Sequence, residues 1–326
     1  MLSDPIGTGR NSRVFRVDLD GAETSFPPSV VVKFYRRYRG DERDRLSTEF
    51  GSLQFLWQNG VRSVPRPIAI DRDRHCAIYE YIAGEGPISL ALAPEDIDMS
   101  VDFLGALRRL RDATGSDALP SASEACFSLG DIVRCVEGRL ERLRRAPRGS
   151  PEAARLHQWI GETFDPLMTE VREWCRGAAG RSCIAFDEPI GREARTLSPS
   201  DFGFHNAIRR PDGALAFVDF EYFGWDDPAK TIVDYLLHPG MALGEPLKRR
   251  FVARAQAAFA DVPKVEARAR IVYPLFGLKW ALILLNDFLP ERFVGADGEW
   301  RLIQLGKAQT VVSRLAVEYD NNPYLS

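Results

Sequence analysis

The sequence lacks a long uninterrupted apolar run. The longest apolar patch, from Ile271 to Leu285, is broken by Lys279, and the first ten residues contain no apolar signal core. A membrane-spanning helix needs about 20 consecutive apolar residues, and a secretory signal needs an apolar centre. We therefore expect neither a membrane span nor a recognisable secretory signal.

Paired cysteines are also missing. The five cysteines are odd in number, widely spaced and free of C-x-x-C pairs. This usage argues against both a disulfide framework and a cysteine-based zinc site. A reducing cytoplasm is the compartment that fits it best.

The sequence has no strong charge of either sign. The net charge of −3 gives no reason to expect nucleic acid or an anionic membrane as a partner. With 45% apolar and 27% charged residues, the composition is that of an ordinary globular protein. The 326 residues are enough for two lobes or domains. Nothing in the sequence indicates the oligomeric state.

The stretch from Thr196 to Pro228 contains the densest group of chemically useful side chains. Asp201 and Asn206 stand five residues apart in a segment with prolines and glycines, which predicts a loop. The apolar run Ala214–Val218 predicts a buried strand, and Asp219 closes that strand. A carboxylate at the end of a strand can face a cleft.

These residue types suit the transfer of a phosphoryl group. That reaction needs a carboxylate to orient the attacking hydroxyl and oxygen ligands that hold magnesium on the phosphates. The pattern D-x-x-x-x-N alone often arises by chance, because Asp and Asn close turns with their own side chains. Asp219, thirteen residues after Asn206, and Glu221 beyond it argue against coincidence.

A glycine-rich turn, residues 6–12, precedes a predicted strand over residues 13–19. Glycine lets backbone N–H groups approach phosphates closely, but a simple hairpin turn would use the same residues. The turn is not a dinucleotide-binding fingerprint, because no third glycine follows and a strand comes where a helix would be needed.

A second predicted strand, residues 29–35, contains Lys33. An edge strand could carry this lysine outward into solvent. The following predicted helix, residues 41–59, has Glu49 within its apolar stripe. A carboxylate on the buried face of a helix is costly unless it is paired, and Lys33 is the natural partner.

The candidate residues follow one another in the order found in kinases. The glycine-rich turn comes first, then the lysine, the glutamate, the D-x-x-x-x-N pattern and the aspartate at the end of a strand. On these residues the sequence resembles the aminoglycoside phosphotransferase and choline kinase family, which are small-molecule kinases with a protein-kinase-like fold. The resemblance is strongest in five segments: Gly7–Val17, Val31–Lys33, Ile78–Gly84, Leu197–Ile208 and Phe217–Pro228.

The resemblance implies an α+β fold with two lobes. Residues 1–83 would form a nucleotide-binding lobe with a small antiparallel sheet and one helix. Residues 84–326 would form a larger, mainly helical lobe with the catalytic loop and the acceptor site. Amphipathic patterns in this part predict helices that include residues 246–260, 265–288 and 304–317.

The resemblance also implies roles for individual residues. Asp201 would take or orient the proton of the acceptor hydroxyl, and Asn206 with Asp219 would ligate Mg²⁺. Lys33 would contact the α- and β-phosphates of ATP and pair with Glu49. The remaining ATP-binding positions would act through their backbone. The phosphates would be covered by Gly7, Gly9, Asn11 and Ser12, and the adenine would lie near Glu80, Tyr81 and Ile82.

Two positions depart from the family pattern. Pro199 stands where a histidine usually precedes the catalytic aspartate by two residues, which puts the support of the loop in doubt more than the chemistry. Thr231 stands where an aspartate often follows the Asp227-Pro228 turn, and Asp234 could substitute for it.

The predicted activity is ATP-dependent transfer of the γ-phosphoryl group to a hydroxyl of a sugar, amino sugar or amino alcohol. The alternative is a nucleotide-binding pseudokinase that acts as a sensor or scaffold, which only Pro199 and Thr231 favour. Phosphorylation of proteins ranks lower, because no recognisable activation segment follows Asp219.

The acceptor itself is not evident from the sequence. The charge of the chain does not support an aminoglycoside as the acceptor. Aromatic residues that could form a cage for choline are present, but core packing would explain them equally well. His205 and His238 are possible cleft residues, although a lone histidine is more often structural.

Overall fold

The computed structural model describes residues 5–7, 9, 11–19, 27–38, 43–86, 92–241, 243–293, 297–322 and 324–325. The chain forms two compact units. The first unit comprises Met1–Ala125, Thr196–Asp226 and Gly240–Ala242, and the second comprises Cys126–Arg195, Asp227–Pro239 and Leu243–Ser326. The predicted lobe boundary after residue 83 falls inside the first unit, and the division into a nucleotide lobe and an acceptor lobe stays a prediction.

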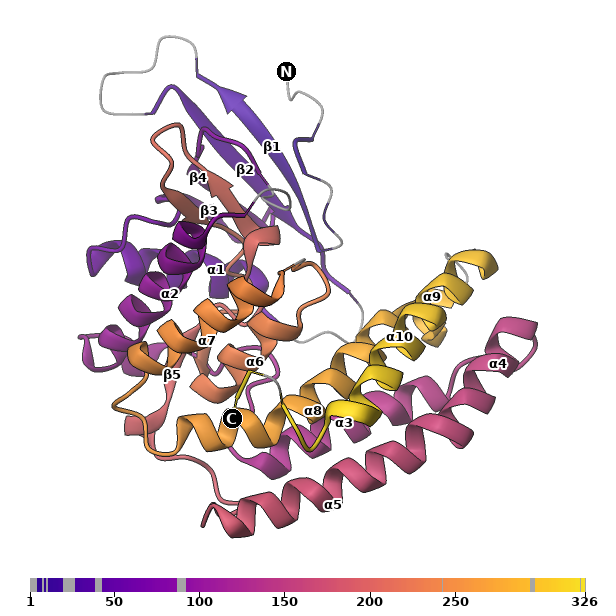
Figure 1. The fold of residues 1–326 in the computed structure, drawn as a ribbon. Helices are drawn as coiled ribbons and strands as arrows, with labels where there is room; N and C mark the ends of the chain where they lie inside the picture. The colour runs from indigo at the N-terminus through magenta and orange to yellow at the C-terminus, as the bar shows by residue number, and fades with distance from the viewer. Residues whose placement is uncertain are drawn as a thin grey trace. The chain divides into compact units, whose positions relative to one another are not determined.

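The first unit contains a four-stranded antiparallel sheet in the order β1-β2-β4-β3 (Figure 1). Its strands are β1 (Ser12–Asp18), β2 (Ser29–Tyr35), β3 (Pro67–Asp71) and β4 (Cys76–Glu80). Lys33 pairs with Val14 on one side and with Ala77 on the other. The edge-strand alternative for Lys33 is therefore wrong, since β2 has a neighbour on both sides.

One helix, α1 (Arg45–Gln58), packs against β3 and β4. The side chain of Asp44 accepts a hydrogen bond from the backbone N–H of Ser47 and so caps the helix, which explains why the helix begins later than predicted. The apolar stripe buries Leu46 and Leu53, and Glu49 lies on the same buried face with an exposure of 3%. The predicted position of Glu49 is confirmed.

The remainder of the first unit is built on helix α2 (Pro94–Arg109) and four strands of three residues each. Strand β5 (Thr196–Ser198) pairs with β8 (Gly224–Asp226), and β6 (Ala207–Arg209) pairs with β7 (Leu215–Phe217). Four aromatic rings pack together here; they belong to Phe103, Phe202, Phe217 and Phe220. This cluster fixes the segments on both sides of Asp201 and Asp219 to α2.

The segment that leaves the sheet is attached directly to β6. Glu85 and Arg209 exchange two backbone hydrogen bonds of 2.8 and 3.0 Å. A Cβ at Gly84 would lie 2.2 Å from the carbonyl oxygen of Arg209, and one at Gly86 would lie 2.7 Å from that of Ala207. Only glycine allows this close approach of two backbones.

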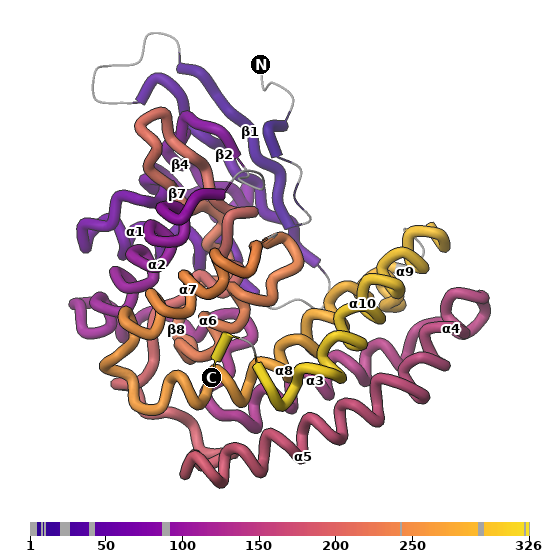
Figure 2. The backbone as a smooth tube through the Cα atoms, in the orientation of Figure 1, coloured from indigo at the N-terminus to yellow at the C-terminus, as the bar shows by residue number. Residues whose placement is uncertain are grey.

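The second unit is helical. Its long helices are α3 (Leu129–Arg144), α4 (Pro151–Trp159), α5 (Asp165–Arg181), α6 (Pro228–Leu237), α7 (Glu245–Ala258), α8 (Val265–Leu284) and α10 (Gly298–Glu318). Helix α8 is apolar on most sides because it packs against α3, α5, α6 and α10 (Figure 2). A π-helical turn, Ile160–Phe164, joins α4 to α5.

Short helices complete the described part of the chain: Leu110–Asp112, Ser116–Ala118, Arg192–Ala194, Phe204–Asn206, Asn286–Phe288 and α9 (Pro290–Phe293). Among the described residues, no helix has both the length and the apolar content needed to cross a membrane. All five cysteines are free thiols.

Candidate active site

Lys33 lies at the centre of the candidate site. Its Nζ donates to Glu49 Oε2 and to Asp219 Oδ1, both at 2.6 Å, and only 6% of the residue is exposed. Burial favours the neutral amine, but the charges of Asp219 and Glu49 outweigh it and hold the pKa of Lys33 above its usual value. The predicted pair of Lys33 and Glu49 is confirmed, and Lys33 also contacts Asp219, 186 positions away.

Glu49 joins three parts of the first unit. Besides Lys33, its carboxylate accepts hydrogen bonds from the hydroxyl of Tyr35 at 2.7 Å and from the backbone N–H of Phe220 at 3.3 Å. Tyr35 was not predicted as a site residue, although Lys33 and Tyr35 are two residues apart on one strand and so share a face of the sheet. Three donors, the Lys33 amine, the Tyr35 hydroxyl and the Phe220 N–H, therefore hold the Glu49 carboxylate in a single arrangement.

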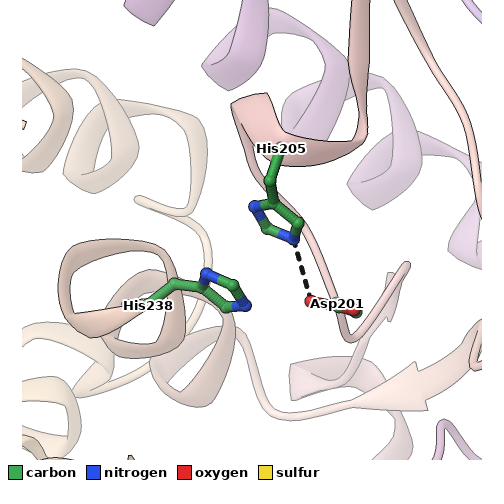
Figure 3. A group of neighbouring side chains, drawn as sticks. All are labelled: Asp201, His205 and His238. Atoms are coloured by element: carbon green, nitrogen blue, oxygen red, sulfur yellow. Dashed lines mark hydrogen bonds and ion pairs between the residues drawn. The ribbon is translucent and has the colours of Figure 1, made fainter. Parts of the chain in front are cut away.

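Asp201 lies in a loop with unusual backbone geometry. Ser200 adopts a left-handed conformation with φ of 67°. Asn206 donates from its side-chain amide to the carbonyl oxygen of Asp201 at 3.0 Å, and His205 Nε2 lies 3.0 Å from Asp201 Oδ1 (Figure 3). The last residue of the D-x-x-x-x-N pattern thus binds the first, and the predicted loop is confirmed.

The hairpin of β6 and β7 brings Asn206 and Asp219 to the same end. The last pair of the ladder is Ala207 with Phe217, and the N–H of Val218 then donates to the carbonyl oxygen of Asn206 at 2.9 Å. Asp219 follows in the left-handed region with φ of 68°, a conformation that Asp tolerates better than most residues. Its side chain is 39% exposed, so it is accessible to a ligand.

Glu221 is the second carboxylate after β7, and it is buried. Its Oε1 accepts a hydrogen bond from the amide of Asn11 at 2.6 Å, and its Oε2 lies 4.0 Å from Lys33 Nζ. Burial, followed by the charge of Asp219, raises the pKa of Glu221 to about 7. Within the part of the chain that the structure describes, Oε2 accepts no hydrogen bond.

Three carboxylates therefore surround one lysine. Glu49, Asp219 and Glu221 each offer an oxygen, and these oxygens lie within 4.8 Å of one another. Arg45 adds a second positive charge, since its Nε lies 3.6 Å from Glu221 Oε1. Such an oxygen-rich, acidic donor set fits a hard divalent cation.

The glycine-rich turn is anchored to the same cluster. Asn11 donates from its side chain to Glu221 Oε1 and to the hydroxyl of Tyr222, each at 2.6 Å. Gly7 pairs with Val14, and Ser12 begins β1 with a buried side chain. Thr8 and Arg10 of this turn lie outside the described residues. The coverage of phosphates by Gly7, Gly9, Asn11 and Ser12 stays a prediction.

The segment predicted to lie near adenine follows β4. The N–H of Glu80 donates to the carbonyl oxygen of Arg66 at 2.8 Å, and its carboxylate accepts from the N–H of Arg66 at 3.1 Å. Tyr81 stacks against the guanidinium of Arg16, and Ile82 is buried. The contact of this segment with adenine stays a prediction.

Asp227–Pro239, which include the Asp227-Pro228 turn, belong to the second unit. Asp227 caps α6 by accepting from the N–H of Ala229 at 2.8 Å, and it forms a buried ion pair with Arg268. Asp234 accepts from Lys279 Nζ at 3.3 Å and from Trp280 Nε1 at 3.0 Å. Within this unit, the ring of His238 packs edge-on against that of Trp280.

Comparisons with known proteins identify the family of the chain. A model of the phosphotransferase enzyme family matches residues 4–270, so the chain belongs to that family. The predicted enzyme class is thereby confirmed. A search of curated proteins returned no match.

Solved structures resemble the chain over almost its whole length. A spectinomycin phosphotransferase in complex with ADP and spectinomycin is 10% identical, with a TM-score of 0.63 and coverage of 98% of this chain and 93% of that one. A choline/ethanolamine kinase family protein from Mesorhizobium loti is 17% identical, with a TM-score of 0.55 and coverage of 98% and 92%. A choline kinase from Cryptosporidium parvum is 12% identical, with a TM-score of 0.59 and coverage of 98% and 91%. The predicted fold class is confirmed.

Proposed function

We propose that this protein is an ATP-dependent kinase that transfers the γ-phosphoryl group to a hydroxyl of a small molecule, namely a sugar, an amino sugar or an amino alcohol. The observation that carries the proposal is the direct contact of Lys33 with both Glu49 and Asp219, at 2.6 Å each. Membership of the phosphotransferase enzyme family supports it.

The positive charge of Lys33 has a clear use in this reaction. The amine is held ionised by Glu49 and Asp219 and is fixed on a central strand, so it can attract the α- and β-phosphates of ATP without reorganising. The glycine-rich turn and the backbone at residues 80–82 would contact the rest of the nucleotide. These groups fit a nucleoside triphosphate, and the proposal takes ATP as the phosphoryl donor.

Asp219 and Asn206 would hold Mg²⁺. The three carboxylates around Lys33, and the Glu221 oxygen that accepts no hydrogen bond from the described residues, fit this cation. When bound, the metal offsets the negative charge that develops on the phosphate oxygens. Asp201, on the loop held by Asn206, would orient the acceptor hydroxyl and take its proton.

The pseudokinase alternative has no support beyond Pro199 and Thr231. The lysine, the glutamate, both aspartates and the asparagine that the reaction needs are all present. The proteins of similar fold include a spectinomycin phosphotransferase, a choline kinase and a choline/ethanolamine kinase family protein, which keeps both amino sugars and amino alcohols among the acceptors to test. A cytoplasmic location stays part of the proposal.

The experiment is a screen of small hydroxyl compounds with Mg·ATP, read out as release of ADP. We expect acceptor-dependent turnover, and we expect Asp201→Asn and Asp219→Asn each to lower it by a factor of about a hundred or more. Asp73→Asn, on an exposed turn between β3 and β4, is the matched control and should leave the rate unchanged. Binding of Mg·ATP with no turnover of any acceptor, or full activity in Asp219→Asn, would reject the proposal.

A further inference from the structure

The catalytic loop has to be held in place without the histidine that usually precedes the aspartate. Position 199 is a proline, and the next residue, Ser200, has a left-handed backbone. A residue from the other side of the loop, His205, lies with its Nε2 3.0 Å from Asp201 Oδ1 (Figure 3).

The position of the His205 ring depends on Gly203. A Cβ at residue 203 would lie 2.9 Å from both Cε1 and Nδ1 of that ring and 2.6 Å from the sulfur of Met241. The same sulfur accepts a hydrogen bond from the backbone N–H of Phe204 at 3.1 Å. The ring is therefore packed directly against the backbone of the loop that it supports.

The contact has a defined direction. An ionised carboxylate can only accept hydrogen bonds, so the hydrogen must lie on Nε2 of His205. Its neighbour Asn206 binds the backbone carbonyl of Asp201 at the same time. Two consecutive residues thus fix Asp201, one through its carboxylate and one through its main chain.

We propose that His205 is a positioning residue for Asp201: its Nε2–H fixes the rotation of the carboxylate that orients the acceptor hydroxyl. The histidine after the aspartate replaces the support that Pro199 cannot give. This inference rests on the proposed kinase function, because it assigns His205 a part in the same reaction.

A pair of variants of equal length tests it. His205→Gln keeps an N–H near the position of Nε2, whereas His205→Met has a similar length and no donor. We expect His205→Met to lower kcat by roughly 10²-fold, the scale expected for a misplaced reacting group. KM for ATP should change little, and His205→Gln should recover most of the lost kcat. Thermal unfolding of both variants shows whether either has lost its fold.

An NMR measurement checks the contact itself. The chain has four histidines, so the side-chain nitrogen signals can be assigned by substitution. The Nε2 signal of His205 should shift in Asp201→Asn.

The outcomes separate the two proposals. Turnover that persists unchanged in His205→Met, an equal loss of kcat in both variants, or an Nε2 signal indifferent to Asp201→Asn overturns the role of His205 alone. A wild-type protein that phosphorylates no acceptor refutes the kinase function and the role of His205 with it.

Discussion

At the scale of single residues, the charge of Glu49 is the first feature to test. Glu49→Gln preserves the shape of the side chain and an acceptor for the Tyr35 hydroxyl but removes one of the two charges within 2.6 Å of Lys33. Lys33 should then pair with Asp219 alone. We expect kcat to fall roughly tenfold or more, because electrostatic preorganisation is lost. ADP release measures this.

Glu170→Gln, an exposed position on α5, is the matched control for that charge change. Chemical denaturation should give the wild-type free energy of unfolding for Glu170→Gln and should show that Glu49→Gln is folded under the assay conditions. Activity at the wild-type level in Glu49→Gln would contradict the importance of the pair.

The residues around Lys33 were predictable to different degrees. The pair with Glu49 could be inferred because a charge on the buried face of a helix requires a partner close by in the fold. The contact of Asn11 with Glu221 could not, since it joins residues 210 positions apart and depends on how the turn meets the segment after β7. His205 carried only a weak signal, because a single histidine has many structural uses.

At the scale of elements, an ion pair attaches the β6–β7 hairpin to helix α2. Asp96, fully buried on α2, accepts two hydrogen bonds from the guanidinium of Arg209 at 2.7 and 2.8 Å. Burial opposes ionisation of Asp96, but the hydrogen bonds from Arg209 and from the N–H of Ala93 outweigh it and lower its pKa below the usual value.

This pair predicts both a stability change and its pH dependence. Asp96→Ala should lower the free energy of unfolding at pH 7 by roughly 2 kcal/mol, because it removes two charge-assisted hydrogen bonds from the Arg209 guanidinium, whose side chain is 33% exposed. Since the folded-state pKa is depressed, the stabilisation is present above the unfolded-state pKa of about 4 and is lost as the pH falls through the folded-state pKa. The variant and the wild type should therefore converge in urea denaturation below pH 4.

Glu95→Ala, an exposed neighbour on the same helix, serves as the control and should change stability little. A difference between Asp96→Ala and the wild type that is as large at low pH as at pH 7 would show that the ionised carboxylate is not the cause.

Several helices and the strands β1 and β2 were predictable from periodicity, and their ends were less so; strand β3 was not predicted. Strand β2 has the predicted limits, and the helix predicted over 304–317 begins instead at Gly298, because Asp297 caps it. The strands β5, β6 and β8 were not predicted, since three residues are too few to show an alternating pattern. Their pairing is set by tertiary contacts with α2 and with one another.

At the scale of the whole molecule, the path of the chain links the two units. Each unit is made of separate segments, and the backbone passes between them after residues 125, 195, 226, 239 and 242. A sequence pattern that changes from strands to helices predicts an α+β fold, but it does not show this interleaving, because the return of residues 196–226 to the first unit depends on long-range packing.

The interleaved chain predicts that the two units unfold together, since neither is a continuous segment that could fold by itself. Cys76 in the first unit and Cys175 in the second are both buried, so labelling of each thiol reports on the unfolding of its own unit. Burial also raises the pKa of Cys175 to about 12, so its thiol should resist alkylation in the native protein. Exposed Cys183 should be labelled without denaturant, as an internal control. Mass spectrometry of protein pulse-labelled in a urea series should give one midpoint for Cys76 and Cys175, and two distinct midpoints would mean that the units unfold independently.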